Sequence, residues 1–166
     1  IWLPDIFLIL AGILLDQFTK HLAVVHLKGK APISLIPGVL ELRYLENRGA
    51  AFGMMQGGKW FFLAITGIAC AAMLYFLIKE RKRLHFMMTF SIALLLSGAI
   101  GNLIDRVALG YVRDMIYVAL IDFAVFNVAD MAVTVGCCLL VLDLLFFKGK
   151  KYMEMMDKKP QTGENS

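Results

Sequence analysis

The chain has 166 residues, of which 60% are hydrophobic and only 18% are charged. A soluble domain of this length could not bury so much apolar surface in a single core, so the composition excludes an ordinary soluble protein and favours one that crosses a membrane several times. The formal net charge of +4 does not by itself indicate a partner. Four apolar segments are long enough to span hydrocarbon, which takes about 20 helical residues. We expect them at about residues 2–27, 60–78, 86–106 and 129–147.

The first of these segments differs from the others because Asp16 and Lys20 interrupt it. A secretory signal peptide would have a shorter, charge-free apolar stretch followed by a cleavage site of small residues. The segment has neither feature, so we interpret it as an uncleaved first helix. The predicted fold class is therefore a mainly α-helical membrane protein with four transmembrane helices, in a single membrane domain that covers residues 1–166.

The basic residues indicate the orientation of these spans. The short connection after the second span contains Lys79, Arg81, Lys82 and Arg83, and the tail after the fourth contains Lys148, Lys150, Lys151, Lys158 and Lys159. Both regions are assigned to the cytoplasm, which places both termini inside. We expect the last residues, about 150–166, to form a disordered cytoplasmic tail because they are polar.

Two segments then lie outside the cytoplasm. In residues 39–46, between the first two spans, apolar side chains alternate with charged ones, which is typical of a strand lying on the membrane surface. Residues 107–128, between the last two spans, are expected to form a connecting loop that contains Asp114.

Polar side chains from four segments converge at one level, near the outer surface of the bilayer. Charged residues inside a membrane are costly and usually mark a protein interior or a functional site. Asp16 and Lys20 are four residues apart, so they share a helix face and can pair. The other members of this group are Asn102, Asp105 and Arg106 at the end of the third span, Asp114 in the loop, and Asn127 and Asp130 at the start of the fourth span. Such alignment indicates a site.

The residue types at this level favour aspartate chemistry. The three histidines, His21, His26 and His85, do not form a base–nucleophile arrangement, and no HExxH metal motif is present. The cysteines lack the paired spacing of a zinc or redox site. Two neighbouring carboxylates cannot both ionise easily, so one keeps a proton and polarises a peptide carbonyl while the other activates water.

Each candidate also has a purely structural interpretation. Asn127 and Asp130 have the spacing of a helix N-terminal cap. Asp105 and Arg106 could form an interfacial ion pair, and Asp114 could be a solvated loop residue.

Two further aspartates, Asp122 and Asp143, have to be considered as site residues. Asp122 lies close enough in the loop to be a third candidate. Asp143 lies about 20 Å along the helix from Asp130, so we place it near the cytoplasmic face and outside the site.

Five sequence motifs identify the chain as similar to lipoprotein signal peptidase, also called signal peptidase II. They are residues 16–20 (DQFTK), 47–53 (NRGAAFG), 101–106 (GNLIDR), 111–116 (YVRDMI) and 126–130 (FNVAD), and they occur in the order of that family. The resemblance covers nearly the whole chain.

The resemblance implies an aspartic-type endopeptidase with Asp114 and Asp130 as its catalytic pair. It implies substrate-binding or supporting roles for Asp16, Lys20, Asn47, Gly101, Asn102, Asp105, Arg106 and Asn127. It implies no metal and no other cofactor. It also implies a small extracytoplasmic β-cradle at about residues 31–53, between the first two helices. Arg113 departs from the family, which usually has an apolar residue at this position.

The partners implied by the resemblance are a prolipoprotein signal peptide with a diacylglyceryl-cysteine and the membrane lipid. A peptide antibiotic of the globomycin type is implied as an inhibitor, and no nucleic acid is implied. The implied location is the bacterial cytoplasmic (inner) membrane, with several spans and an active site near the outer leaflet.

Two other classes of protein remain open at this stage. A small transporter or ion-binding protein could use Asp16, Lys20, Asp105 and Asp130 as a relay, although no repeat or broken helix supports it. A non-catalytic scaffold could use the same cluster to stiffen helix ends. If the chain is a peptidase, the helix N-terminus beside Asp130 predicts that this residue is the ionised member of the pair in the free enzyme.

Overall fold

The computed structural model describes residues 3–49 and 59–146. In chain order its elements are α1 (Leu3–Leu27), β1 (Ile33–Ile36), β2 (Leu40–Asn47), α2 (Lys59–Glu80), α3 (Phe86–Ala108), β3 (Val112–Val118), the short 3-10 helix η2 (Ala119–Ile121) and α4 (Val128–Phe146). Within the described residues, four helices are long and apolar enough to cross a membrane, which confirms the predicted fold class. The expected start of the first span at residue 2, the cradle residues 50–53, residue 147 and the tail at 150–166 lie outside the described residues.

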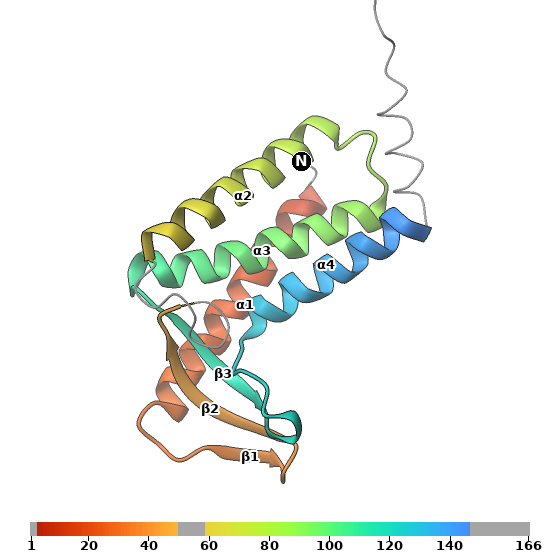
Figure 1. Ribbon diagram of the computed structural model, residues 1–166. Coiled ribbons are helices and arrows are strands. Elements are labelled where there is room, and N and C mark those ends of the chain that lie inside the picture. Colours follow the sequence, from red (N-terminus) through yellow and green to blue (C-terminus); the bar gives the residue numbers. More distant parts are fainter. Residues whose placement is uncertain (1–2, 50–58, 147–166) are drawn as a thin grey trace, which may run out of the picture.

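Helix α3 is the central element of the bundle, and it contacts α1, α2 and α4 (Figure 1). Small residues make this close packing possible, as is common between helices in membranes. A Cβ atom on Gly98 would lie 2.3 Å from the carbonyl oxygen of Ala129 in α4, and one on Gly101 would lie 2.6 Å from Oδ2 of Asp16 in α1. A larger residue at Gly98 would push α3 away from α4, and one at Gly101 would displace the Asp16 carboxylate.

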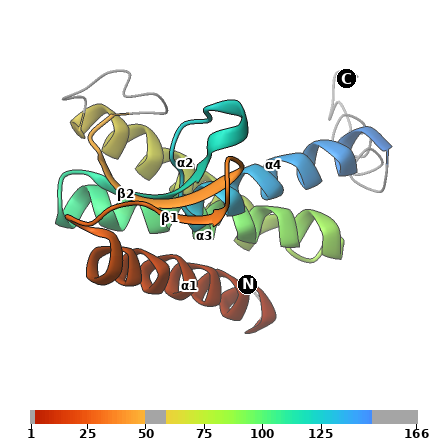
Figure 2. The ribbon, with the colours of Figure 1, turned by 90° about the horizontal axis from the view of Figure 1, so that it is seen from below.

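A three-stranded antiparallel sheet lies beyond the ends of α2, α3 and α4 and beside the last turns of α1 (Figures 1 and 2). The strand order is β1-β2-β3, and β2 pairs with β3 so that Leu45 is opposite Asp114 and Asn47 is opposite Val112. The expectation of a loop around Asp114 is therefore wrong. Residues 112–118 form a strand because β2, although distant in the sequence, supplies their hydrogen-bonding partner.

Two apolar clusters hold these parts together. One joins α2 to α3 through Leu77, Leu84, Met88, Ile92 and Leu96. The other joins the sheet to α1, where Ala23, Leu27 and Met115 are buried together. The second cluster fixes β3 against α1, and β3 carries Asp114.

The end of the bundle opposite the sheet contains separate contacts of two other aspartates, Asp5 and Asp143. Arg81 donates to both carboxylate oxygens of Asp5, at 2.6 and 3.3 Å. Nε2 of His85 lies 2.8 Å from Oδ2 of the buried Asp143. The N-terminal end of α1 and the α2–α3 connection lie at this end (Figure 1), so Asp143 is far from the sheet.

Candidate active site

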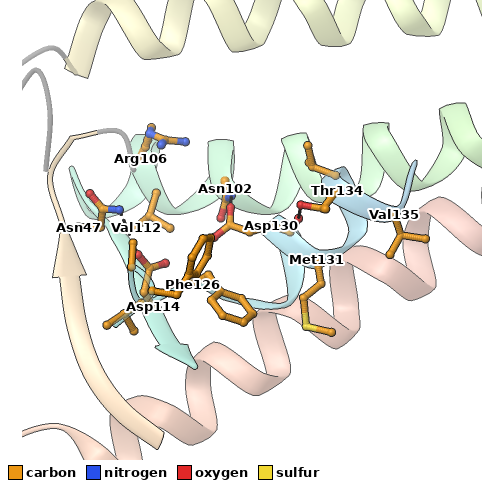
Figure 3. Close-up of a pocket in the computed structure, with 14 residues that line it drawn as sticks. Asn47, Asn102, Arg106, Val112, Asp114, Phe126, Asp130, Met131, Thr134 and Val135 are labelled. Atoms are coloured by element: carbon orange, nitrogen blue, oxygen red, sulfur yellow. Dashed lines mark hydrogen bonds between the residues drawn. The ribbon is translucent and has the colours of Figure 1, made fainter. Parts of the chain in front are cut away.

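Two aspartates line one cavity, on the side of the bundle that carries the sheet. The cavity has a volume of about 510 Å³ and lies between β2, α3, β3 and α4 (Figure 3). Asp114 comes from β3, and Asp130 comes from the first turn of α4. Asn47, Asn102 and Arg106 line the same cavity, so polar groups from four elements meet there.

The remaining wall of the cavity is mostly apolar. It is formed by residues 123–126, which precede α4, and by Met131, Val133 and Val135 of α4 itself. A few polar groups within an apolar wall are typical of a binding site that orients its ligand through those groups.

Asp114 is almost completely buried, with 1% of its surface exposed. Nδ2 of Asn47 donates to one of its carboxylate oxygens at 3.1 Å, and Nδ2 of Asn127 donates to the other at 2.7 Å. Burial raises the pKa of Asp114 to about 6, and the negative charge of Asp130 acts in the same direction, although the two amide donors lower it. Asp114 therefore holds a proton more readily than an ordinary aspartate.

Asp130 is half-buried and forms part of the cap of α4. The backbone N–H of Asn127 donates to Oδ2 of Asp130 at 3.2 Å, and the backbone N–H of Asp130 donates to Oδ1 of Asn127 at 2.9 Å. This reciprocal pair is a capping box, so the structural interpretation of these residues is confirmed. Nδ2 of Asn102 donates to Oδ1 of Asp130 at 2.7 Å. Asp130 is therefore a cap residue that also lines the cavity.

Asn102 and Asn127 connect the two aspartates to each other. Nδ2 of Asn127 lies 3.1 Å from Oδ1 of Asn102, and Nζ of Lys20 donates to the same oxygen at 2.9 Å. Because the amide oxygens accept from Lys20 and from the backbone of α4, the amide nitrogens must point at the two carboxylates. The orientation of both amides is thus determined by their surroundings.

A buried ion cluster of Asp16, Lys20, Asp105 and Arg113 lies behind these amides. Lys20 is fully buried, and its Nζ lies 2.7 Å from Asp16 and 3.6 Å from Asp105, so the pairing expected between Asp16 and Lys20 is confirmed. The second oxygen of Asp16 accepts the backbone N–H of Ala129 at 3.0 Å. The cluster therefore links α1 and α3 to the N-terminus of α4.

The other predicted residues lie close to this cluster or to the cavity. The carbonyl oxygen of Gly101 accepts a hydrogen bond from Nε2 of Gln17 at 3.1 Å. Arg106 lines the cavity, and its guanidinium carbon lies 5.3 Å from the ring centroid of Phe62. Among the described residues, Asp105 forms ion pairs with Lys20 and Arg113 rather than with its neighbour Arg106.

Two residues that contribute to this arrangement, Gln17 and Arg113, were not among the predicted site residues. Gln17 donates to Asp105 at 3.1 Å and accepts from Arg113 at 2.9 Å. The position of Gln17, next to Asp16 in a predicted motif, was the available signal. Asp122 hydrogen-bonds to Tyr117 and does not line the cavity, so it is not a third member of the pair.

Comparisons with known proteins agree with this geometry. The family model described as Signal peptidase (SPase) II matches residues 8–146. Two relatives named lipoprotein signal peptidase come from Streptococcus thermophilus, with 48% identity over 82% of this chain and 88% of the relative, and Symbiobacterium thermophilum, with 41% identity over 88% of this chain and 97% of the relative.

The chain belongs to the signal peptidase II family. Two solved structures of bacterial membrane enzymes, determined by the in meso method, have a similar fold. The first has a TM-score of 0.80 and 33% sequence identity, and the match covers 97% of this chain and 94% of the solved chain. The second has a TM-score of 0.76 and 35% sequence identity, and the match covers 86% of this chain and 93% of the solved chain. The family predicted from the five motifs is confirmed, and signal peptidase II membership does not favour a transporter or a scaffold.

Proposed function

We propose that this chain is an aspartic endopeptidase that removes the signal peptide from prolipoproteins, with Asp114 and Asp130 as its catalytic pair. One observation carries the proposal: in a chain of the signal peptidase II family, a buried and a half-buried aspartate line the same mostly apolar cavity. Asn47, Asn102 and Asn127 hold the two carboxyl groups by hydrogen bonds. No metal or cofactor is needed for this chemistry.

In the proposed reaction, Asp114 begins protonated and Asp130 begins ionised. Asp130 takes a proton from water, whose oxygen attacks the scissile carbonyl carbon, while Asp114 gives its proton to the carbonyl oxygen. The resulting tetrahedral diol collapses when Asp114 recovers a proton from it and Asp130 passes its proton to the leaving nitrogen. The C–N bond breaks, and both aspartates return to their starting states. The raised pKa of Asp114 supports this division of roles.

The proposed substrate is a prolipoprotein with a diacylglyceryl-cysteine, cut just before that cysteine. The apolar wall formed by residues 123–126 and α4 supports a lipid-bearing substrate, which would enter from the bilayer. A peptide antibiotic of the globomycin type would compete for the same cavity. The supporting roles of Asp16, Lys20, Gly101, Asp105 and Arg106 belong to this proposal too.

We further propose that the chain is a single domain of the bacterial inner membrane with both termini in the cytoplasm. Lys79 in the last turn of α2 and the basic residues 81–83 that follow the helix support this orientation by the positive-inside rule. The sheet and the cavity would then lie at the outer leaflet.

The test is cleavage of a synthetic diacylglyceryl lipobox peptide by the full chain in lipid. We expect cleavage by the original protein, loss of cleavage in Asp114→Asn and Asp130→Asn, and unchanged cleavage in Asp122→Asn, the matched control from the same outer segment. Cleavage that survives in either of the first two variants would refute the catalytic pair. Absence of cleavage by folded original protein would refute the function itself.

A further inference from the structure

Arg113, the residue directly before Asp114 on β3, contacts both Asp105 and Gln17 through its side chain. Its Nε and Nη2 atoms donate to the two carboxylate oxygens of Asp105 at 3.1 and 2.7 Å. Nη2 also donates to Oε1 of Gln17 at 2.9 Å. Asp105 is fully buried and the Arg113 side chain is 14% exposed, so this bidentate contact is shielded from water. Such paired bonds constrain direction as well as distance.

The main chain of Arg113 also makes two hydrogen bonds to neighbouring side chains. Its backbone N–H donates to Oδ2 of Asp105 at 3.0 Å, and its carbonyl oxygen accepts a hydrogen bond from Nδ2 of Asn127 at 3.4 Å. That carbonyl belongs to the peptide group that joins Arg113 to Asp114. Both ends of Arg113 are therefore attached to neighbouring elements, one residue away from the proposed catalytic carboxyl.

Arg113 also balances the charge of the buried ion cluster. The cluster contains two carboxylates, Asp16 and Asp105, and two cations, Lys20 and Arg113. Without the guanidinium, Lys20 would be the remaining cation between two buried carboxylates. It would be drawn away from Asn102, which it contacts at 2.9 Å and which in turn holds Asp130. A loss at Arg113 would thus reach both aspartates.

We propose that Arg113 is a positioning residue for peptide cleavage: its bidentate contact with Asp105 and its bond to Gln17 hold β3 against α1 and α3, and so set the direction of the Asp114 carboxyl. This proposal rests on the proposed function. It differs from a purely structural role because it predicts a change in the chemical step and not only in stability.

The chain contains a matched control for this distinction. Arg81 makes a bidentate contact with Asp5 that has similar burial, 17% and 8% exposed, at the opposite end of the bundle. Lysine keeps the charge at either position but cannot reproduce the planar fork of arginine. Arg113→Lys and Arg81→Lys therefore remove the same kind of contact, and only the first lies beside Asp114.

The experiment measures kcat and KM on the diacylglyceryl lipobox peptide, together with thermal unfolding, for the original chain and both lysine variants. We expect kcat of Arg113→Lys to fall by about tenfold or more with little change in KM, since a displacement of about 1 Å can cost about a hundredfold. We expect Arg81→Lys to keep the original kcat. An equal kcat in the two variants, with the original chain active, would overturn the role of Arg113 and leave the proposed function intact.

A second variant covers the case in which Arg113→Lys does not fold. The double variant Arg113→Met with Asp105→Asn removes one charge of each sign, so it leaves no unpaired buried ion in the cluster. We expect the double variant to fold and to have a lower kcat than the original chain, because the bidentate guanidinium contact is still missing. Recovery of the original kcat in this double variant would contradict positioning by Arg113. An inactive original chain would instead refute the proposed function.

Discussion

Replacing Asp114 by asparagine should change stability in a way that depends on pH. The folded chain raises the pKa of this carboxyl from 3.8 to about 6, so the folded state disfavours its ionised form. The contribution of this carboxyl to stability is therefore fully present below its unfolded pKa of 3.8, is lost as the pH rises from there to about 6, and is absent at higher pH. The pKa difference corresponds to about 3 kcal/mol of unfolding free energy.

Asparagine does not titrate, so it escapes this loss. It does have a cost at every pH, because Asp114 accepts hydrogen bonds from the amides of Asn47 and Asn127, and an asparagine carbonyl can replace only one acceptor. One lost hydrogen bond costs about 1 kcal/mol. The variant should then be about 1 kcal/mol less stable than the original at pH 4 and about 2 kcal/mol more stable at pH 8.

The assay measures the free energy of unfolding of the full chain in detergent at pH 4 and pH 8, with unfolding monitored by circular dichroism. Cleavage of the lipobox peptide is measured in parallel. Asp130→Asn is the matched variant, and it should be less stable than the original at pH 8 because it loses part of the α4 cap, worth about 1 kcal/mol. A stability difference between Asp114→Asn and the original chain that is the same at both pH values would refute the reasoning from burial of the charge.

Three further predictions concern the packing, the buried charges and the extent of the site. Gly101→Ala should lower both stability and cleavage, since the new Cβ would lie 2.6 Å from Oδ2 of Asp16, whereas Gly67→Ala, with no atom within 4 Å, should leave both unchanged in the same thermal and cleavage assays. Lys20→Met should destabilise the chain by about 3–5 kcal/mol in detergent unfolding, because it leaves the buried Asp16 carboxylate unpaired. A loss of stability no larger than that caused by replacing a surface lysine would contradict this prediction. Asp143→Asn should keep the original kcat, as the residue lies at the opposite end of α4, and a lost kcat would place it in the site after all.

The transmembrane helices could be predicted from the sequence because apolar runs and the spacing of charges are local signals. The pairing of Asp16 with Lys20 and the cap formed by Asn127 and Asp130 could be predicted for the same reason, since each involves residues within one helical turn. These contacts follow from periodicity alone.

The structure around Asp114 could not be predicted in this way. The charges at Arg113 and Asp114 obscure the alternation of β3, and the pairing strand β2 is far away in the sequence. The contact between Asp105 and Arg113 spans a chain reversal in which Gly110 has a φ of 83°, so its spacing matches neither a helix nor a strand. The neighbouring pair Asp105 and Arg106 was the local alternative, and the folded chain uses the distant partner.

The capping role of Asn127 has a consequence for how the enzyme could accept different substrates. Its amide nitrogen donates to the Asp114 carboxyl, and its backbone N–H donates to the Asp130 carboxyl. Asn127 therefore connects the two carboxyl groups across the ends of the intervening segment. The middle of that segment, residues 119–125, lies outside this connection, and part of it forms the apolar wall of the cavity. We therefore expect recognition and chemistry to be separable: this stretch can vary in shape or sequence between relatives while the geometry of the carboxyl groups stays the same.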